Sequence, residues 1–173
     1  FFYYTSGASV SEVLIDRFTG ELKLEKAELV LDIGKSIHEG IDLGQTYGGF
    51  VQGLGWLTTE ELRYAENGSL LSYSPTTYKI PNISDIPEEL SVEFVDNPEH
   101  KINIWRSKAV GEPPLMLSLS VWLAVKHALS CFKENQIPKL NIPATGEEIL
   151  RRIDEIHDLE GFSTEEVEIP VIS

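Results

Sequence analysis

With 173 residues, of which 42% are hydrophobic, the chain is long enough to bury a hydrophobic core as one domain or as two small ones. Its 28 acidic residues outnumber its 14 basic residues and leave a net charge of −14, which argues against binding to nucleic acid or to an anionic membrane. A single cysteine, Cys131, excludes an internal disulfide and an Fe–S cluster held by this chain alone, and favours a reduced, cytoplasmic setting.

The longest apolar stretch runs from Pro113 to Val125, with serines at 118 and 120, and Lys126 follows it. This stretch is too short to span a bilayer and predicts a buried helix instead. The chain opens on four aromatic residues, 1–4, which are typical of the inside of a strand, and it has no initiator methionine. We therefore expect it to be a piece of a longer protein.

The first third of the chain predicts a hairpin followed by a helix. Hydrophobic and polar residues alternate over 8–16, the sequence Arg-Phe-Thr-Gly at 17–20 is typical of a turn, and leucines recur over 22–33. Two antiparallel strands joined by that turn follow from this pattern. From Asp42 to about Leu62 the hydrophobic residues recur with helical spacing.

Two more strands and a long helix are expected in the middle of the chain. Asn67-Gly68 predicts a turn, and a loop rich in proline over 75–87 leads to a strand at 90–95. Residues 101–105 predict another strand. The helix that follows position 112 extends to Phe132 and is apolar nearly all round, as a central helix would be.

The chain is expected to end in a short helix and an acidic tail. Thr145 and Glu148 have the spacing of a capping box for a helix that reaches Ile153. Residues 159–173 form the tail, which is expected to be loose. The elements together predict an α+β fold, in which a β-hairpin and mixed strands pack with a glycine-rich helix and a central apolar helix.

A carboxylate at a stiff corner is the first candidate catalytic group. Residues 108–115 read Lys-Ala-Val-Gly-Glu-Pro-Pro-Leu, which sets Glu112 between Gly111 and two prolines. Pro113 disfavours the α region for the residue before it, so Glu112 is expected to be extended, at a corner between a strand and a helix. The partial positive charge of a helix N-terminus favours an ionised carboxylate. This arrangement suits a general base, although dipole complementarity alone would also explain it.

Glycines form two stripes on the helix predicted from Asp42. Gly44 and Gly48, and likewise Gly49 and Gly53, are four residues apart and lie on common faces. Glycine costs about 1 kcal/mol relative to alanine inside a helix. Something is therefore expected to pack very closely on this backbone: another helix, a strand or a flat cofactor.

Gln45 lies beside these glycines and has two interpretations. Its spacing from Asp42 is that of a helix-capping pair, so it can simply reach back to the start of the helix; alternatively it contacts a ligand. A phosphate-binding loop is excluded, because the segment has neither the Walker lysine nor a Gly-x-Gly-x-x-Gly after a strand. Gln52 is interpreted as a packing or surface residue.

Four segments occur in the order of a known family. They read Ile-Asp-Leu-Gly-Gln at 41–45, continuing to Gln-Gly-Leu-Gly at 52–55; Ser-Pro-Thr-Thr-Tyr-Lys-Ile-Pro at 74–81; the segment 107–115; and Pro-Ala-Thr-Gly-Glu-Glu-Ile at 143–149. Together they resemble the C-terminal part of the molybdopterin-binding subunit of xanthine dehydrogenases, in the molybdenum hydroxylase family. The resemblance extends from about Tyr3 to Arg152. The double proline after the glutamate favours xanthine dehydrogenase over the related aldehyde oxidases.

The resemblance implies roles for two residues. Glu112 corresponds to the family's active-site glutamate, which acts as a base, and Gln45 to a glutamine that contacts molybdopterin near the metal. The implied reaction hydroxylates a purine ring carbon, as in the conversion of hypoxanthine or xanthine to urate, with oxygen from water. Fe–S clusters and FAD, on other domains or subunits, would carry the electrons away. The chain alone would be an incomplete, inactive enzyme that binds only part of the molybdenum–molybdopterin cofactor.

Residues 1–158 are accordingly expected to be the C-terminal portion of a molybdopterin-binding domain, and 159–173 an acidic tail. Expected partners are the upstream remainder of the molybdenum subunit, Fe–S and FAD domains, a small N-heterocyclic substrate and further copies in an oligomer; nucleic acid and membrane are not expected. Two alternatives stay open: an aldehyde or N-heterocycle oxidoreductase of the same superfamily, and a non-catalytic assembly module. Each predicts exposed apolar surface and self-association.

Other polar and aromatic residues are interpreted as structural. Lys108 and Arg106 are expected to hold the loop before the glutamate by hydrogen bonds. His38 and His127 have no partner at ligand spacing, so no metal site formed by side chains of this chain is expected. Cys131 and the three tryptophans are expected to be buried.

Overall fold

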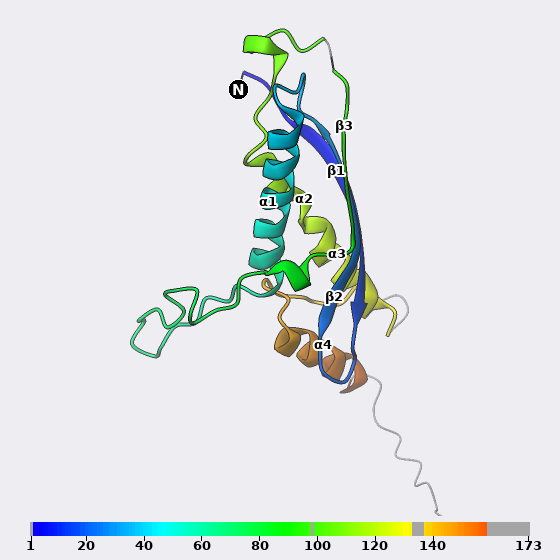
Figure 1. The fold of residues 1–173 in the computed structure, drawn as a ribbon. Coiled ribbons are helices and arrows are strands. Elements are labelled where there is room, and N and C mark those ends of the chain that lie inside the picture. The colour runs from blue at the N-terminus through cyan, green and yellow to red at the C-terminus, as the bar shows by residue number, and fades with distance from the viewer. Residues whose placement is uncertain (1, 98, 133–136, 159–173) are drawn as a thin grey trace, which may run out of the picture.

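The structure, a computed structural model, describes residues 2–97, 99–132 and 137–158 (Figure 1). Its sheet contains β1 (Ser6–Ile15), β2 (Leu22–Asp32) and β3 (Glu89–Phe94), in the order β1-β2-β3. β1 is antiparallel to β2, whereas β3 is parallel to it. The predicted hairpin and the predicted strand at 90–95 are therefore confirmed, as is the α+β class.

A β-bulge in the hairpin sets which face of β2 is buried. Glu12 pairs with Lys26 and Val13 pairs with Leu24, so Glu25 is an extra residue in β2. Beyond the bulge the buried side chains shift by one position, and Leu24 and Ala27 both face the core. The long strand thereby keeps one buried face along its length.

Two helices cover that face of the sheet. α1 (Glu39–Thr58) contributes Phe50 and Leu54 to the main core, and α3 (Leu119–Ser130) contributes Val121. A second core cluster joins α3 to α4 (Gly146–Asp158), where Leu129 and Ile149 are fully buried. Figure 1 shows α1 alongside the upper part of the sheet and α4 near the lower end of the sheet.

The helix predicted after position 112 is two helices. α2 (Pro113–Leu117) ends at Leu117, α3 begins at Leu119, and Ser118 is the cap between them. Ser118 Oγ donates a hydrogen bond to the Leu115 carbonyl oxygen at 2.6 Å, so the hydroxyl turns back onto α2 at the break. The prediction of one continuous helix was wrong.

The strand predicted at 101–105 was also wrong. The segment contains a 3-10 turn, η2 (Ile104–Arg106), in which Trp105 and Arg106 have φ angles of 58° and 61°. Ile102 and Ile104 in this segment are 64% and 82% exposed, so no sheet buries them. The turn instead directs Ser107 toward Gly34, with which it forms an isolated β-bridge.

Between α1 and β3 the chain forms an arm, residues 59–82, that projects from the body (Figure 1). The predicted turn at Asn67-Gly68 is confirmed: Gly68 has φ of 82°, and Tyr64 bridges Leu70 across it. A 3-10 turn, η1 (Ile83–Asp85), returns the arm to the sheet.

α1 runs over Glu39–Thr58 rather than the predicted Asp42 to Leu62, and α4 extends beyond the predicted Ile153. The acidic tail, 159–173, lies outside the described residues. Within the part of the chain that is described, no helix has both the length and the apolar character needed to cross a membrane.

Candidate functional site

Glu112 lies at the start of α2, but its backbone differs from the expectation. Its φ of −97° and ψ of −42° are helical rather than extended, and residues 108–111 before it are not a strand. The restriction imposed by Pro113 is therefore outweighed by the onset of the helix. The side chain is exposed and makes no capping hydrogen bond. Because α2 has only five residues, its dipole contributes little to the site.

The structure excludes the interpretation of Gln45 as a capping residue, because another residue caps the N-terminus of α1. His38 is the N-cap, and its Nδ1 accepts a hydrogen bond from the Ile41 N–H at 3.3 Å. Asp42 lies within the first turn and accepts a hydrogen bond from Ser36 Oγ at 2.6 Å. Gln45 is exposed, and among the described residues no hydrogen bond to its side chain is present. The expected Asp42–Gln45 capping pair was wrong, and the amide is available to a ligand.

The two glycine stripes of α1 have different surroundings. A Cβ at Gly49 would lie 3.1 Å from Pro114 Cβ, and one at Gly53 would lie 2.5 Å from the Leu115 carbonyl oxygen. The stripe of Gly49 and Gly53 is therefore the surface on which α2 packs. At Gly44 and Gly48 no described atom outside the helix itself would lie within 4 Å. Close packing is confirmed on one stripe, and the other faces open space.

The close packing of α2 on α1 brings the two candidate residues together. Gln45 Oε1 lies 3.3 Å from the position that a Cβ on Gly111 would occupy, and Gly111 is the residue before Glu112. The two candidates are 67 positions apart in the chain (112 − 45), so the tertiary fold alone creates this proximity. Gln45, Gly111 and Glu112 are all exposed. The Gln45 amide thus lies on the surface beside the residue that precedes Glu112.

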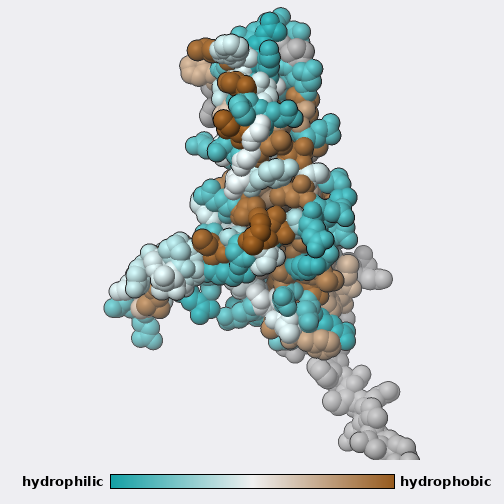
Figure 2. Space-filling view, in the orientation of Figure 1, coloured by the Kyte–Doolittle hydropathy of each residue, from teal (hydrophilic) through white to brown (hydrophobic). Residues whose placement is uncertain are grey.

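The exposed face of α1 carries no charge beyond its first turn. Although the whole chain has a net charge of −14, the exposed residues of this helix after Gly40 are neutral. Figure 2 shows neutral and hydrophobic residues running down the middle of the view, over α1. We call this surface the α1 face; it comprises Ile41, Gly44, Gln45, Gly48, Gln52 and Trp56.

The segment before Glu112 is attached to the end of β2. The Lys108 N–H donates to the Ile33 carbonyl oxygen at 2.8 Å. The Lys108 ammonium lies 2.6 Å from Asp32 Oδ2. The same oxygen accepts a hydrogen bond from Asn97 Nδ2 at 2.7 Å, and Asp32 Oδ1 accepts one from the Gly34 N–H at 2.9 Å. Burial alone would raise the pKa of Asp32, but the hydrogen bonds from Lys108, Gly34 and Asn97 outweigh it and hold that pKa below its ordinary value.

Asp32 was not among the residues singled out from the sequence. Its partner Lys108 is 76 positions away, so no local spacing links the two residues. A local signal does exist, because an aspartate two residues before Gly34, at the end of a buried strand, is typical of an Asx turn. The expectation that Lys108 holds the loop is confirmed.

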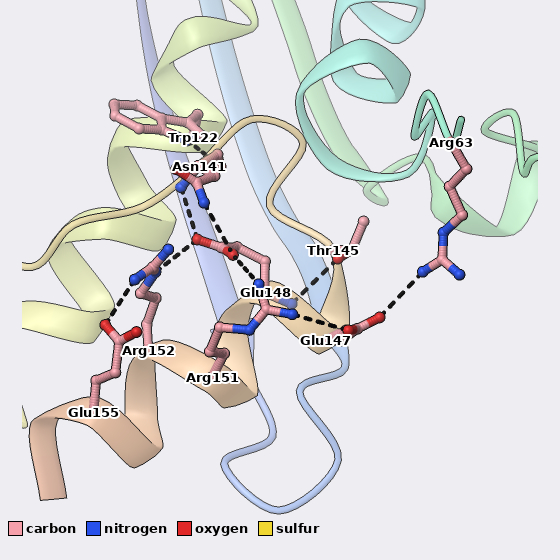
Figure 3. Close-up of polar contacts among 9 residues, drawn as sticks. All are labelled: Arg63, Trp122, Asn141, Thr145, Glu147, Glu148, Arg151, Arg152 and Glu155. Carbon is pink, nitrogen blue, oxygen red and sulfur yellow. Dashed lines mark hydrogen bonds and ion pairs between the residues drawn. The ribbon is translucent and has the colours of Figure 1, made fainter. Parts of the chain in front are cut away.

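A second polar cluster surrounds Glu148 on α4 (Figure 3). The Thr145 hydroxyl accepts a hydrogen bond from the Glu148 N–H at 3.2 Å, as a capping box requires. The Glu148 carboxylate, however, accepts bonds from the Asn141 N–H at 2.8 Å and from Arg152 Nε at 2.7 Å. Burial raises its pKa, and the hydrogen bonds from Arg152 and Asn141 reverse this and lower it. This cluster fastens the loop before α4 and is structural.

The remaining expectations concern histidines, tryptophans and the cysteine. Across the described ranges, no three His, Cys, Asp or Glu side chains are grouped to hold a metal ion. Trp56 and Trp105 are 52% and 71% exposed, and Cys131 is exposed. The expectation that these three side chains are buried was wrong; they add to the exposed hydrophobic surface that the sequence predicted.

Comparisons with known proteins identify the family to which this chain is similar. A family model described as "Molybdopterin cofactor-binding domain" matches residues 1–87, which is half of the chain. Xanthine dehydrogenase/oxidase of Felis catus is 44% identical over 156 residues, or 86% of this chain, and xanthine dehydrogenase 2 of Arabidopsis thaliana is 43% identical over 159 residues, or 85%. The chain spans about 12% of the length of each of these relatives.

The fold has solved counterparts. The structure of quinoline 2-oxidoreductase from Pseudomonas putida 86 superimposes with a TM-score of 0.75 and 28% identity, covering 83% of this chain and 18% of that one. Three findings lead to one assignment: the family model matches half of the sequence, the xanthine dehydrogenases are similar in sequence, and the fold is shared. The chain belongs to the molybdopterin cofactor-binding domain family of the molybdenum hydroxylases.

Proposed function

We propose that the chain is the C-terminal catalytic segment of a molybdenum hydroxylase, in which Glu112 is the general base and Gln45 contacts molybdopterin. The observation that carries this proposal is the 3.3 Å between Gln45 Oε1 and the Cβ position of Gly111, next to Glu112. Residues 1–158 are then the C-terminal portion of the molybdopterin-binding domain.

The residues present fit a large, flat, polar cofactor. An amide side chain both donates and accepts hydrogen bonds, and the Gln45 amide has no partner among the described residues. Gly44 and Gly48 flank it and leave the helix backbone open to close approach. When bound, the molybdenum cofactor supplies the redox chemistry. The part left to Gln45 is to orient the cofactor by hydrogen bonding.

Glu112 is suited to accept a proton beside that cofactor. Its carboxylate is exposed, and within the described part of the chain it is engaged in neither a hydrogen bond nor an ion pair. Its backbone is fixed by Pro113 and by the packing of α2 on Gly49. A positioned carboxylate that removes a proton in the rate-limiting step contributes typically about 10²–10⁴-fold to the rate.

The proposed substrate is a purine, hydroxylated at a ring carbon with oxygen from water. Support for a purine comes from the names of the two xanthine dehydrogenases and from the double proline after Glu112. A second candidate is another N-heterocycle, favoured by the similar fold of quinoline 2-oxidoreductase. A non-catalytic assembly module is the alternative from another class.

The α1 face supports the proposal that further protein covers the site. An uncharged helix face with Ile41 and Trp56 at 60% and 52% exposure is unusual on a chain with a net charge of −14. Since the chain spans about 12% of its relatives, the proposed occupant is the upstream remainder of the molybdenum subunit. Fe–S clusters and FAD are proposed to lie on other domains or subunits, in a cytoplasmic oligomer.

The test is Glu112→Gln in the complete enzyme that contains this segment. The amide keeps the size of the side chain but cannot act as a base, so turnover should fall by at least about 100-fold. Molybdenum content should stay normal, because the variant retains Gln45. The matched control is Glu66→Gln, which changes an exposed acid in the arm. Turnover of Glu112→Gln close to that of the control would refute the assignment of the base.

A further inference from the structure

We propose that Asp32 is a positioning residue for Glu112: through Lys108, its carboxylate fixes the segment 107–112 against Gln45. This inference rests on the proposed function, because the position of the segment affects turnover only if Glu112 reacts. Asp32 itself is assigned no contact with the cofactor or the substrate.

The ion pair that carries this inference is buried. The side chains of Lys108 and Asp32 are only 7% and 19% exposed, and the distance between Nζ and Oδ2 is 2.6 Å. The ion pair between Lys79 and Asp85 has the same distance, but its side chains are 54% and 25% exposed. Solvent therefore screens the Lys79–Asp85 pair much more strongly than the Asp32–Lys108 pair.

Stability alone does not explain a buried ion pair at this position. A buried pair is often replaced by hydrophobic residues of similar volume with no loss of stability, because desolvation offsets the attraction. The backbone already joins the two segments, since the Lys35 N–H donates to the Arg106 carbonyl oxygen at 2.8 Å. What a short, directional charged hydrogen bond adds is a fixed position for the segment.

The pair transfers the rigidity of the sheet to the segment. Asp32 ends β2, the central strand, which is paired on both sides. At the next residue, Tyr3 Oη accepts a hydrogen bond from the Ala109 N–H at 3.1 Å. Val110 then packs against the main core, and Gly111 lies against Gln45. Each residue from Lys108 to Gly111 is thus fixed by a different contact, and Glu112 follows directly.

The experiment uses the complete, cofactor-loaded enzyme with Asp32→Asn and the double variant Asp32→Asn/Lys108→Met. Asp85→Asn is the matched control, because it removes the charge from an equally short ion pair whose lysine is 54% exposed. Asp32→Asn should lower kcat per bound molybdenum by roughly 10- to 100-fold, since a misplacement of about 1 Å costs about that much. KM should change much less than kcat.

A measurement independent of activity follows the segment itself. Hydrogen exchange of the peptide that spans 107–112 should become at least about tenfold faster in Asp32→Asn, whereas exchange in β1 should be unchanged. Faster exchange throughout the domain would indicate a general structural role and would overturn the positioning role. If Asp32→Asn fails to fold because Lys108 is left buried without a counter-charge, the neutral double variant carries the same test.

Double-mutant analysis separates this inference from the proposed function. With Glu112→Gln already present, Asp32→Asn should cause no further loss of kcat, because no base is left to position. The positioning role alone would be overturned if Asp32→Asn lowered kcat in the Glu112→Gln background by as large a factor as in the wild type. It would also be overturned if the double variant Asp32→Asn/Lys108→Met had the same kcat as Asp85→Asn. If Glu112→Gln itself retains turnover, the proposed function fails, and the positioning role fails with it.

Discussion

Gly48 and Gly53 of α1 provide a matched test of how α2 is held. Both are inside the helix, but Gly48 is exposed and Gly53 is buried. An alanine Cβ at Gly53 would overlap Ser118 Oγ and lie 2.5 Å from the Leu115 carbonyl oxygen, whereas at Gly48 it would meet nothing within 4 Å. Since the Leu115 oxygen belongs to the backbone, relief of the contact requires α2 to move.

The magnitude follows from two opposing contributions. Either substitution gains about 1 kcal/mol of helix propensity, so this gain cancels when the two variants are compared. Overpacking at Gly53 costs about 1–3 kcal/mol. Gly53→Ala should therefore have a free energy of unfolding about 1–3 kcal/mol below that of Gly48→Ala, which corresponds to a Tm difference of roughly 2–12 °C in a domain of this size.

The assay is urea denaturation and thermal unfolding of this chain, followed by circular dichroism at several protein concentrations so that self-association is taken into account. Equal stabilities for the two variants would refute the account of α2 packing. Gly48→Ala should have opposite effects on two quantities. It should raise the free energy of unfolding of this chain alone, but it should lower the molybdopterin content of the complete enzyme, because in the enzyme the stripe of Gly44 and Gly48 is proposed to face the cofactor.

The remaining predictions concern α4 and the Gln45 contact. Glu148→Ala should lower the free energy of unfolding by about 3 kcal/mol, because it leaves the largely buried Arg152 guanidinium with only the exposed carboxylate of Glu155 and removes the acceptor of the Asn141 N–H. Arg151→Ala, at an exposed side chain, should lower it by less than about 1 kcal/mol, and urea titrations compare the two variants. The pKa of Glu148 in the folded chain is lowered from 4.5, so its stabilising effect is complete above pH 4.5 and is lost as the pH falls through the pKa of the folded state. Glu148→Gln should therefore show a smaller change in the free energy of unfolding between neutral pH and pH 3 than the wild type. Identical pH profiles for the two proteins would contradict this. Gly111→Ala would place a methyl group 3.3 Å from Gln45 Oε1, so it should shift the Gln45 amide resonances and reduce molybdopterin content in the complete enzyme with little change in Tm.

The parts of the fold that the sequence predicted correctly have local signals. The hairpin has alternating residues around a turn that contains Gly20, and the arm has Asn67-Gly68. The segment predicted as a strand at 101–105 instead leads into the 3-10 turn Ile104–Arg106, and Ile104 remains 82% exposed because no sheet buries it. At the break, Ser118 bonds back to the Leu115 carbonyl oxygen and also packs against Gly53 of α1, which lies far away in the sequence.

The candidate site was found through motifs, and its geometry was not predictable from them. The spacing of Asp42 and Gln45 suggested a cap because it could not show that His38 already caps the helix. The proximity of Gln45 to Gly111 depends on the packing of α2 on a glycine stripe, and the buried Asp32–Lys108 pair joins residues 76 positions apart. The last two contacts are tertiary, and a single sequence carries no direct record of such contacts.

The most direct test of the central claim is a crystal structure of the complete, cofactor-loaded protein that contains this chain. The account predicts that Gln45 and Glu112 both lie within about 4 Å of the bound cofactor or of a substrate analogue held beside it, with Gly44 and Gly48 facing the cofactor or the segment that encloses it. If Gln45 makes no contact with the cofactor and Glu112 points into solvent away from it, the catalytic proposal is contradicted and the assembly module becomes the better account.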